Sequence, residues 1–234
     1  MHRLGFMEGE LDMLTEALTE TPSVKVATIF SHLNCSDMPQ EDRYTREQIA
    51  RFDRMSGRLA AALPYPVLRH TANSAAIERF PEARFDMCRL GLGLYGFGWE
   101  HNAGLRPVSA LKTRIVQIKR LPAGDAVGYG RAGKLTRPTT TATIPIGYAD
   151  GLNRRLGNGH AYCLVNGQKA PYVGNICMDV CMIDVTDIDC KEGDKAIIFG
   201  DDLPVTVLSE ILETIPYEIL TSVSNRVKRV YYQN

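Results

Sequence analysis

Apolar residues in the first hundred positions alternate between helical and strand-like spacing. Leu11, Leu14 and Leu18 recur at helical intervals and predict a helix over residues 8–19. Residues 24–31 are apolar and β-branched on both faces, which is typical of a strand buried in a parallel sheet. This start indicates an α/β fold.

A long amphipathic helix is expected next, over residues 46–63. Thr45 is its expected N-cap, and Gln48 three residues later completes a capping box. Pro64 ends it. Two short strands separated by a helical segment are then expected at residues 67–70 and 86–89. The alternation predicts about three βα units of a barrel, whereas a closed (β/α)8 barrel needs eight.

The second half has the pattern of a β-rich domain. Residues 110–121 alternate polar and apolar positions and predict one half-exposed strand. Asn166-Gly167 between two apolar runs predicts a tight hairpin. Further strands are expected at residues 139–145, 161–165, 169–173, 180–185, 195–199 and 229–232, and short helices at 205–213 and 217–224.

The two patterns together predict a chain of two domains. We expect a partial (β/α)8 TIM-type barrel over residues 1–102, followed by a C-terminal β-rich domain over residues 103–234. Residues 101–107 have the composition of a linker. The fold class is therefore α/β plus all-β.

Composition and charge narrow the function classes. The chain has 234 residues, of which 44% are hydrophobic and 23% charged, as in ordinary globular proteins. Lys+Arg and Asp+Glu both number 27, so nothing favours a nucleic-acid or anionic-membrane partner. No apolar run is long enough to span a membrane, and the first residues lack the apolar core of a signal peptide. We expect a cytoplasmic protein.

The six cysteines do not predict a metal site. Cys177 and Cys181 lie four apart in a strand-like run, but no second pair provides the other two ligands of a zinc site. Reduced, buried cysteines of a cytoplasmic protein are expected instead. The set is Cys35, Cys88, Cys163, Cys177, Cys181 and Cys190.

Four polar segments stand in a fixed order in the second half. They are Val127-Gly128-Tyr129-Gly130, Ile144-Pro145-Ile146-Gly147-Tyr148-Ala149-Asp150-Gly151, Gly174-Asn175-Ile176-Cys177-Met178-Asp179 and Tyr217-Glu218-Ile219-Leu220-Thr221. This order and spacing resembles the alanine racemases, which use pyridoxal 5'-phosphate (PLP). The resemblance implies interconversion of L- and D-alanine for bacterial cell-wall peptidoglycan, by a homodimer whose subunits share each active site.

Racemisation requires that a proton leave one face of the α-carbon and return to the other. One base on each face, beside a cofactor that accepts the electron pair, is the simplest solution. The resemblance implies that Tyr129 is one base, that a lysine is the other, and that Arg3 in Arg3-Leu4-Gly5 lies near the reaction centre. A phenol titrates near ~10 and needs help to act as a base. Outside this motif, Tyr129 would be interpreted as a tyrosine at a strand edge.

A phosphate site is expected in the first half. Barrel enzymes often bind phosphate at the loops after their last two strands. Ser74 follows the penultimate predicted strand, and Gly91 and Leu92 follow the last. A hydroxyl and backbone N–H groups can together bind a phosphate. The resemblance adds Tyr217, which would reach the same phosphate.

Arg89 and His32 are implied to contact the PLP ring. The resemblance places an arginine opposite the pyridine nitrogen, and an arginine keeps its proton. Arg89 would therefore leave that nitrogen unprotonated, weaken the electron sink and disfavour side reactions such as transamination. Without the resemblance, Arg89 could form a salt bridge at the barrel rim, and His32 could be structural.

The remaining implied residues concern the substrate. Met178 and Asp179 match a pair that approaches the substrate from the second subunit, with the Met178 backbone on its carboxylate. Tyr148 matches a tyrosine at the mouth of the substrate channel, and Asp37 and Arg154 match positions further out in the corridor through which substrate enters. An arginine expected three residues before Met178 is Asn175 here, which changes the charge of the outer corridor.

No lysine in this chain has the neighbourhood of the PLP lysine. Lys25 lies in Val24-Lys25-Val26, which does not match the family segment. The resemblance covers essentially all of this chain but only the later two-thirds or so of a family protein, so we expect a fragment that is catalytically incomplete by itself.

Two alternatives remain open from the sequence. One is a PLP enzyme acting on another small amino acid such as serine. The other is a non-enzymatic β-domain that serves dimerisation or regulation. PLP-dependent decarboxylases share the barrel-plus-β layout, but the arrangement from Tyr129 to Met178 fits racemases better.

Overall fold

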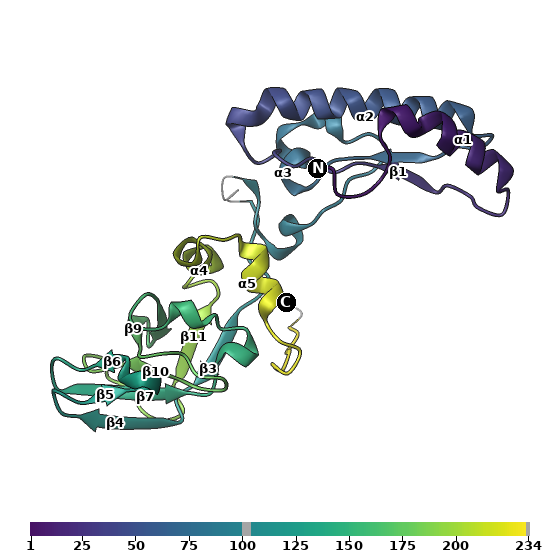
Figure 1. Cartoon of the computed structure of the whole chain (residues 1–234). Coiled ribbons are helices and arrows are strands. Elements are labelled where there is room, and N and C mark those ends of the chain that lie inside the picture. The colour runs from purple at the N-terminus through teal and green to yellow at the C-terminus, as the bar shows by residue number, and fades with distance from the viewer. Residues whose placement is uncertain (100–103, 233–234) are drawn as a thin grey trace. The chain divides into compact units, whose positions relative to one another are not determined.

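The computed structural model describes residues 1–99 and 104–232. The chain divides into two compact units, Met1–Val108 and Ser109–Asn234, which Figure 1 draws in purple to blue and in teal to yellow. The expected domain boundary at residues 102 and 103, and the start of the expected linker, lie outside the described residues.

The first unit contains a short parallel sheet and several helices. Strands β1 and β2 pair in parallel, with Phe30 opposite His70. A core cluster joins α2, α3 and the segments after each strand; it consists of Leu33, Ile49, Ala72, Ala76, Phe80 and Ala83. The elements are η1 Glu8–Glu10, α1 Leu11–Glu20, β1 Thr28–Phe30, η2 Pro39–Glu41, α2 Asp42–Ala62, β2 Leu68–His70, α3 Ser74–Arg79, η3 Pro81–Ala83 and η4 Leu92–Tyr95.

The long helix is confirmed, but its predicted N-cap is wrong. Helix α2 begins at Asp42, directly after the 3-10 turn η2, which Pro39 starts. Thr45 therefore lies inside the first turns, fully buried, and its hydroxyl donates to the Cys35 carbonyl at 3.3 Å. The helix ends at Ala62, before Pro64, as predicted.

One prediction about the barrel strands is wrong in part, and another is wrong. The strand predicted over residues 24–31 is only Thr28–Phe30, and it is not buried on both faces, since Phe30 is 63% exposed. Residues 86–89 form no strand. Asp86 N–H bonds to Arg69 O of β2 at 3.0 Å, and Arg89 N–H bonds to Ala72 O, just after β2, at 2.9 Å. A strand is buried on both faces only where other elements pack on both faces of its sheet, and in residues 1–99 and 104–232 the sheet of β1 has two strands.

The second unit is built on a seven-stranded antiparallel sheet with the order β3-β11-β8-β9-β10-β7-β4, and β5 and β6 form a separate hairpin. Ile144, Ile183, Ile198, Leu208 and Tyr172 are fully buried in its core. The strands are β3 Leu111–Arg114, β4 Gln117–Leu121, β5 Ala126–Val127, β6 Gly133–Lys134, β7 Thr139–Ile144, β8 Tyr162–Val165, β9 Gln168–Val173, β10 Cys181–Asp184 and β11 Lys195–Phe199.

The single strand predicted over residues 110–121 is two strands at opposite edges of this sheet. Between them Ile115 is 2% exposed and bonds through its N–H to Asp194 O, while the Val116 N–H bonds to Thr143 O, both at 2.9 Å. The chain therefore passes from the β11 edge to the β7 edge within two residues, which requires a curled sheet. Alternation of side chains cannot reveal such a change of partner, because both strands continue the same pattern.

Other local predictions have mixed outcomes. Asn166 and Gly167 have φ values of 48° and 75° and form the expected turn between β8 and β9. Helices α4 Val205–Leu212 and α5 Pro216–Ser222 confirm the late helices. Residues 229–232 were expected to form a strand and do not. The Arg229 side chain instead donates to carbonyls of residues 223–227.

The cysteines are all free thiols. Only Cys163 and Cys181 are buried, and Cys88 is exposed, so the expectation of buried thiols holds for two of the six. Cys177 precedes β10 and is not on the same strand as Cys181. No helix in the described part of the chain has both the length and the apolar character needed to cross a membrane.

Candidate functional site

Arg89 is held at the ends of β1 and β2 by carbonyls and ring nitrogens. One terminal nitrogen lies 2.6 Å from His70 Nδ1, and the other lies 3.2 Å from His32 Nδ1. The second nitrogen also donates to the carbonyls of Ser31 at 2.7 Å and Thr71 at 3.2 Å. Within the described residues, the hydrogen bonds of Arg89 all run from its two terminal nitrogens to carbonyls and ring nitrogens, so no carboxylate pairs with it and its Nε–H is unused. One N–H of a fixed cation is thus left for a ligand acceptor.

Electrostatics keep the two histidines neutral. Burial and the positive charge of Arg89 lower the pKa of His70 below its ordinary value of 6.5. The same two causes, with smaller contributions from Arg3 and the N-terminus, lower the pKa of His32. Burial also lowers the pKa of Arg89. At neutral pH each imidazole can therefore present a lone pair to the guanidinium.

Aromatic stacking adds to the support of this arginine. The Phe30 ring stacks on the His70 ring, with centroids 5.5 Å apart and planes 6° apart. The Arg89 guanidinium lies 5.4 Å from the centre of Phe30. Arg89 and His32 were identified from the sequence, but His70 was not. His70 ends β2, so it also lies where barrel enzymes place functional residues.

Ser74 and the glycines after residue 90 form a compact group of hydrogen-bond donors. The Ser74 hydroxyl oxygen accepts from the backbone N–H of Gly91 at 2.9 Å and of Gly93 at 3.1 Å. Leu92 begins η4 between them. A Cβ at Gly93 would lie 2.8 Å from Leu90 Cδ1 and 3.5 Å from Ser74 Oγ, so a side chain would fill this space. Two neighbouring amides and a hydroxyl can bind an anion. Of these three groups, the Gly93 amide was not predicted from the sequence.

Two further predicted residues lie in the first unit. Arg3 is exposed, and its charge contributes to the lowered pKa of His32. Asp37 is also exposed, and its backbone carbonyl accepts from Trp99 Nε1 at 3.3 Å.

In the second unit, Tyr148 and Met178 lie on two loops that are bonded together. Tyr148 begins η7 (Tyr148–Asp150), and its N–H donates to Cys177 O at 3.0 Å, while the Ala149 N–H donates to Met178 O at 3.0 Å. A Cβ at Gly147 would overlap both accepting carbonyls, so this contact requires glycine. Tyr148 is 44% and Met178 is 53% exposed. Within the described residues, the Met178 N–H donates no hydrogen bond.

Arg226 joins the same two loops by ion pairs. Its Nε lies 2.7 Å from Asp150 Oδ1, and a terminal nitrogen lies 2.6 Å from Asp179 Oδ1. Burial by itself would raise the pKa of Asp150, but hydrogen bonds from Arg226 and from the Gly147 N–H outweigh it and lower that pKa. The sequence did not single out Arg226, because a lone arginine in a C-terminal segment has no local signal for its partners.

A cavity of about 330 Å³ lies beside Tyr148. Its lining includes Arg154, which begins η8 (Arg154–Leu156), and Glu218 from α5. Tyr217 precedes Glu218 in the same helix and is partly buried. The structure therefore brings Tyr148 and Arg154 to one cavity.

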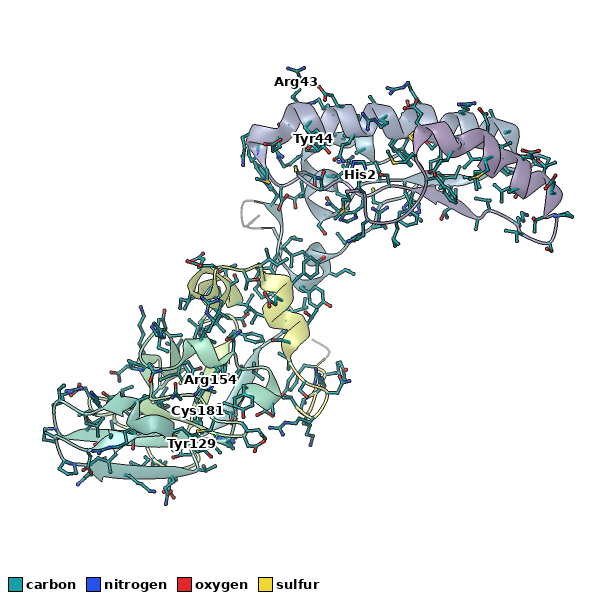
Figure 2. The ribbon with its side chains drawn as sticks, viewed as in Figure 1. His2, Arg43, Tyr44, Tyr129, Arg154 and Cys181 are labelled. Atoms are coloured by element: carbon teal, nitrogen blue, oxygen red, sulfur yellow. The ribbon has the colours of Figure 1, made fainter. Side chains whose placement is uncertain are left out.

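Tyr129 stands on an exposed turn after β5. It begins η6 (Tyr129–Arg131), between Gly128 and Gly130, which have φ values of 79° and 67°. The side chain is 73% exposed, and Figure 2 labels it on the unit that holds the seven-stranded sheet. The Tyr129 carbonyl accepts from Asn175 Nδ2 at 3.1 Å.

The predicted residues thus fall into two groups, one in each unit. The first group is Arg3, His32, Asp37, Ser74, Arg89, Gly91 and Leu92, and the second is Tyr129, Tyr148, Arg154, Met178, Asp179 and Tyr217. Their contacts within each unit are as given above, and their roles toward substrate and cofactor stay predictions.

Comparison with protein families gives one consistent result. Residues 1–98 match the family "Alanine racemase, N-terminal domain", and residues 108–231 match "Alanine racemase, C-terminal domain". An alanine racemase of Clostridium novyi is 39% identical over 246 residues, which cover 100% of this chain and 63% of the relative. Alanine racemase 2 of Caldanaerobacter subterraneus is 40% identical, over 99% of this chain and 62% of the relative. The chain spans about 63% of the length of such relatives.

Solved structures agree with this result and confirm the predicted fold class. The alanine racemase of a D-cycloserine-producing Streptomyces lavendulae superposes with a TM-score of 0.91 at 32% identity, over 100% of this chain and 64% of that one. The alanine racemase of Bartonella henselae, solved with covalently bound pyridoxal phosphate, has a TM-score of 0.85 at 36% identity, over 99% and 64%.

Proposed function

This chain belongs to the alanine racemase family, and on that premise we propose that the protein containing it interconverts L- and D-alanine with PLP as cofactor. The observation that best supports this is the setting of Arg89. A guanidinium with no carboxylate partner in the described residues, held by carbonyls and neutral imidazoles, keeps an unused N–H. Such a group suits a neutral ring nitrogen, because it offers a hydrogen bond and keeps its own proton.

The first unit's residues fit PLP at both ends of the molecule. Arg89 would face the pyridine nitrogen, with His32 close to the ring. The Ser74 hydroxyl and the amides of Gly91 and Gly93, which here donate to Ser74 Oγ at 2.9 and 3.1 Å, would hold the phosphate. Leu92 would complete the phosphate set of this unit, and the family resemblance adds Tyr217 from the second unit. When bound, PLP supplies the sink for the electron pair left by the departing α-proton.

The second unit would supply proton transfer and substrate contacts. We propose that the Tyr129 phenol oxygen takes or returns the α-proton on one face, with Arg3 near the reaction centre. The unused Met178 N–H would donate to the substrate carboxylate, beside Asp179. Tyr148 would stand at the mouth of the channel, with Asp37 and Arg154 further out.

The base on the opposite face is proposed to be a lysine outside these 234 residues. Lys25 does not fit this role, because its ammonium lies 5.2 Å from the centre of the Tyr65 ring, on an exposed part of the chain. We also propose a homodimer in which Tyr129 and Met178 act across the interface, since 73% and 53% of these side chains are exposed. Its role would be the cytoplasmic supply of D-alanine for peptidoglycan.

The proposal is tested by Tyr129→Phe in the whole PLP-loaded protein, with L-alanine as substrate and D-alanine formation as the measurement. Loss of a base on one face is expected to lower kcat by about 10²- to 10⁴-fold. Tyr162→Phe is the matched control, because Tyr162 packs under Lys169 in the sheet and its loss should leave activity unchanged. Full activity of Tyr129→Phe would refute the assignment, and faster turnover of L-serine would favour the serine alternative.

A further inference from the structure

A chain of amide hydrogen bonds ends on the backbone of Tyr129. Asn175 Nδ2 donates to the Tyr129 carbonyl at 3.1 Å, and Asn175 Oδ1 accepts from Asn158 Nδ2 at 3.0 Å. Asn158 is fixed in turn, because its backbone N–H donates to Gly174 O at 2.8 Å. Three segments far apart in sequence therefore meet at this turn.

The orientation of Asn175 follows from the chemistry of its partners. A carbonyl can only accept a hydrogen bond, so the amide nitrogen of Asn175 must face Tyr129. Its oxygen then points to Asn158, which must present its own amide nitrogen. Only one orientation of each amide allows both hydrogen bonds to form. A carboxylate in place of Asn175 would have no donor for the Tyr129 carbonyl.

Backbone packing brings the same three segments into contact. Gly174 has a φ of 69°, and a Cβ there would lie 2.5 Å from Val127 O, so only glycine allows the loop to approach the Tyr129 turn this closely. On the other side, Gly128 faces the backbone of Asn175, since a Cβ added at Gly128 would lie 3.5 Å from Asn175 N. The Asn175 side chain thus starts from a backbone that already touches the turn.

Beyond this packing, the turn has few hydrogen bonds of its own in the described part of the chain. Gly128, Gly130 and Arg131 all have positive φ, and the internal bond of the turn, from Arg131 N–H to Gly128 O, is 3.2 Å long. Strand β5 pairs with β6 over two residues only. A side-chain hydrogen bond also reaches the Tyr129 backbone, and the Asn175 amide donates it.

We propose that Asn175 and Asn158 are positioning residues that set the place of the Tyr129 phenol through this amide chain. The inference rests on the proposed function, in which Tyr129 is one of two bases. It also gives a physical role to Asn175, which stands where the family pattern has an arginine, because its neutral amide supports the turn. A misplaced base slows its own proton transfer while the opposite face is unaffected.

The test uses the whole PLP-loaded protein with four variants: Asn175→Ala, Asn158→Ala, Asn166→Ala and Tyr129→Phe. Asn166 is a matched control, because it resembles Asn158 in its positive φ (48° against 56°), its exposure and its Nδ2 bond, here to Asp189 O at 2.9 Å. Asn175→Ala is expected to lower kcat by about tenfold, and Asn158→Ala by about threefold. The deciding readout is the α-deuterium isotope effect, measured separately with deuterated L- and D-alanine.

Each result has a distinct meaning. A larger isotope effect with only one enantiomer for Asn175→Ala and Asn158→Ala, and an unchanged one for Asn166→Ala, supports the proposal, since a loss of folded protein alters neither isotope effect. Isotope effects equal to those of Asn166→Ala overturn it.

Hydrogen exchange separates this inference from the proposed function. Backbone amides of residues 127–133 are expected to exchange about tenfold faster in Asn175→Ala than in Asn166→Ala. If Tyr129→Phe keeps full activity, the proposed function fails, and faster exchange still shows that the amide chain holds the turn. If Tyr129→Phe is inactive but exchange and isotope effects do not change in Asn175→Ala, only the positioning role fails.

Discussion

The two units hold their candidate functional groups in opposite ways. In the first unit, Arg89 is held by three carbonyls and two imidazoles at 2.6–3.4 Å, and Ser74 is held by two backbone amides. In the second, Tyr129 and Met178 project from loops with 73% and 53% of their surface exposed. A charged group is held in one place by many such hydrogen bonds, and the proposed dimer would need Tyr129 and Met178 to be exposed as they are.

The completeness of the two cores differs in the opposite direction. The first unit has a two-stranded sheet and one small cluster around Phe80, and it leaves Phe30 63% exposed. The second has a seven-stranded sheet with residues such as Ile183 fully buried. The unit that holds its candidate groups most firmly is thus the one with the less complete core, and the predictions below test that contrast.

Core truncation should have the largest effect, and it should act on one unit at a time. Phe80→Ala is expected to cost about 3–5 kcal/mol of unfolding free energy and Ile183→Ala about 2–5 kcal/mol, because each side chain is fully buried. Trp99 fluorescence reports on the first unit, and hydrogen exchange of β7 and β10 reports on the second. Equal losses at both probes for either variant would contradict the division into two cooperative units.

Lowering the pH should destabilise the first unit before the second, by less than core truncation does. The pKa values of His32 and His70 are lowered in the folded chain, so folding disfavours their protonation. The first unit should therefore have its full stability above pH 6.5 and lose part of it as pH falls from 6.5 toward the folded pKa values. For Asp150 the folded pKa is lowered below 3.8, so its contribution persists down to about pH 3.8 and is lost below.

Urea unfolding at pH 7.5 and 5.5 checks this difference. The Trp99 transition should move to lower urea at pH 5.5, while protection of β7 and β10 should hardly change. His70→Gln should reduce the shift of the Trp99 transition. A Trp99 transition independent of pH in this range would show that the histidines titrate alike in the folded and unfolded chain.

Removal of an exposed ion pair should change the unfolding free energy least. Arg43 lies near the start of α2, where Figure 2 labels it, and its pair with Glu47 at 3.0 Å leaves the Arg43 side chain 93% exposed. Arg43→Gln is expected to change the unfolding free energy by less than about 0.5 kcal/mol, since water screens such pairs. A loss above about 1 kcal/mol in urea titration would show that this helix end contributes more than its contacts suggest.

Local signals in the sequence were reliable where one segment alone decides the structure. Asn166-Gly167 forms the predicted turn because both residues tolerate positive φ, and Pro64 follows the end of α2 because proline cannot continue it. The prediction of Thr45 as N-cap was wrong because the preceding Pro39 turn leads directly into the helix. Two valid start signals competed, and packing against Cys35 decided between them.

Contacts between distant segments could not be predicted in the same way. Nothing in the alternation of residues 110–121 shows that the chain changes partner at Ile115, since that depends on how the sheet curls. Arg226 gave no local signal, yet it bridges Asp150 and Asp179, which lie 76 and 47 residues away. His70 ends a predicted strand, as His32 follows one, but only the folded chain brings its Nδ1 to 2.6 Å from Arg89.

The sequence by itself determined the fold class, the family and which residue types stand at each motif, because these depend on local periodicity and on motif spacing. The tertiary structure decided which polar groups share a partner: Arg89 with two neutral histidines, Ser74 with Gly91 and Gly93, and Tyr129 with Asn175. The physical reason is the short range of these interactions. A hydrogen bond requires heavy atoms within about 3 Å, and only the folded chain brings residues that are tens of positions apart to that distance.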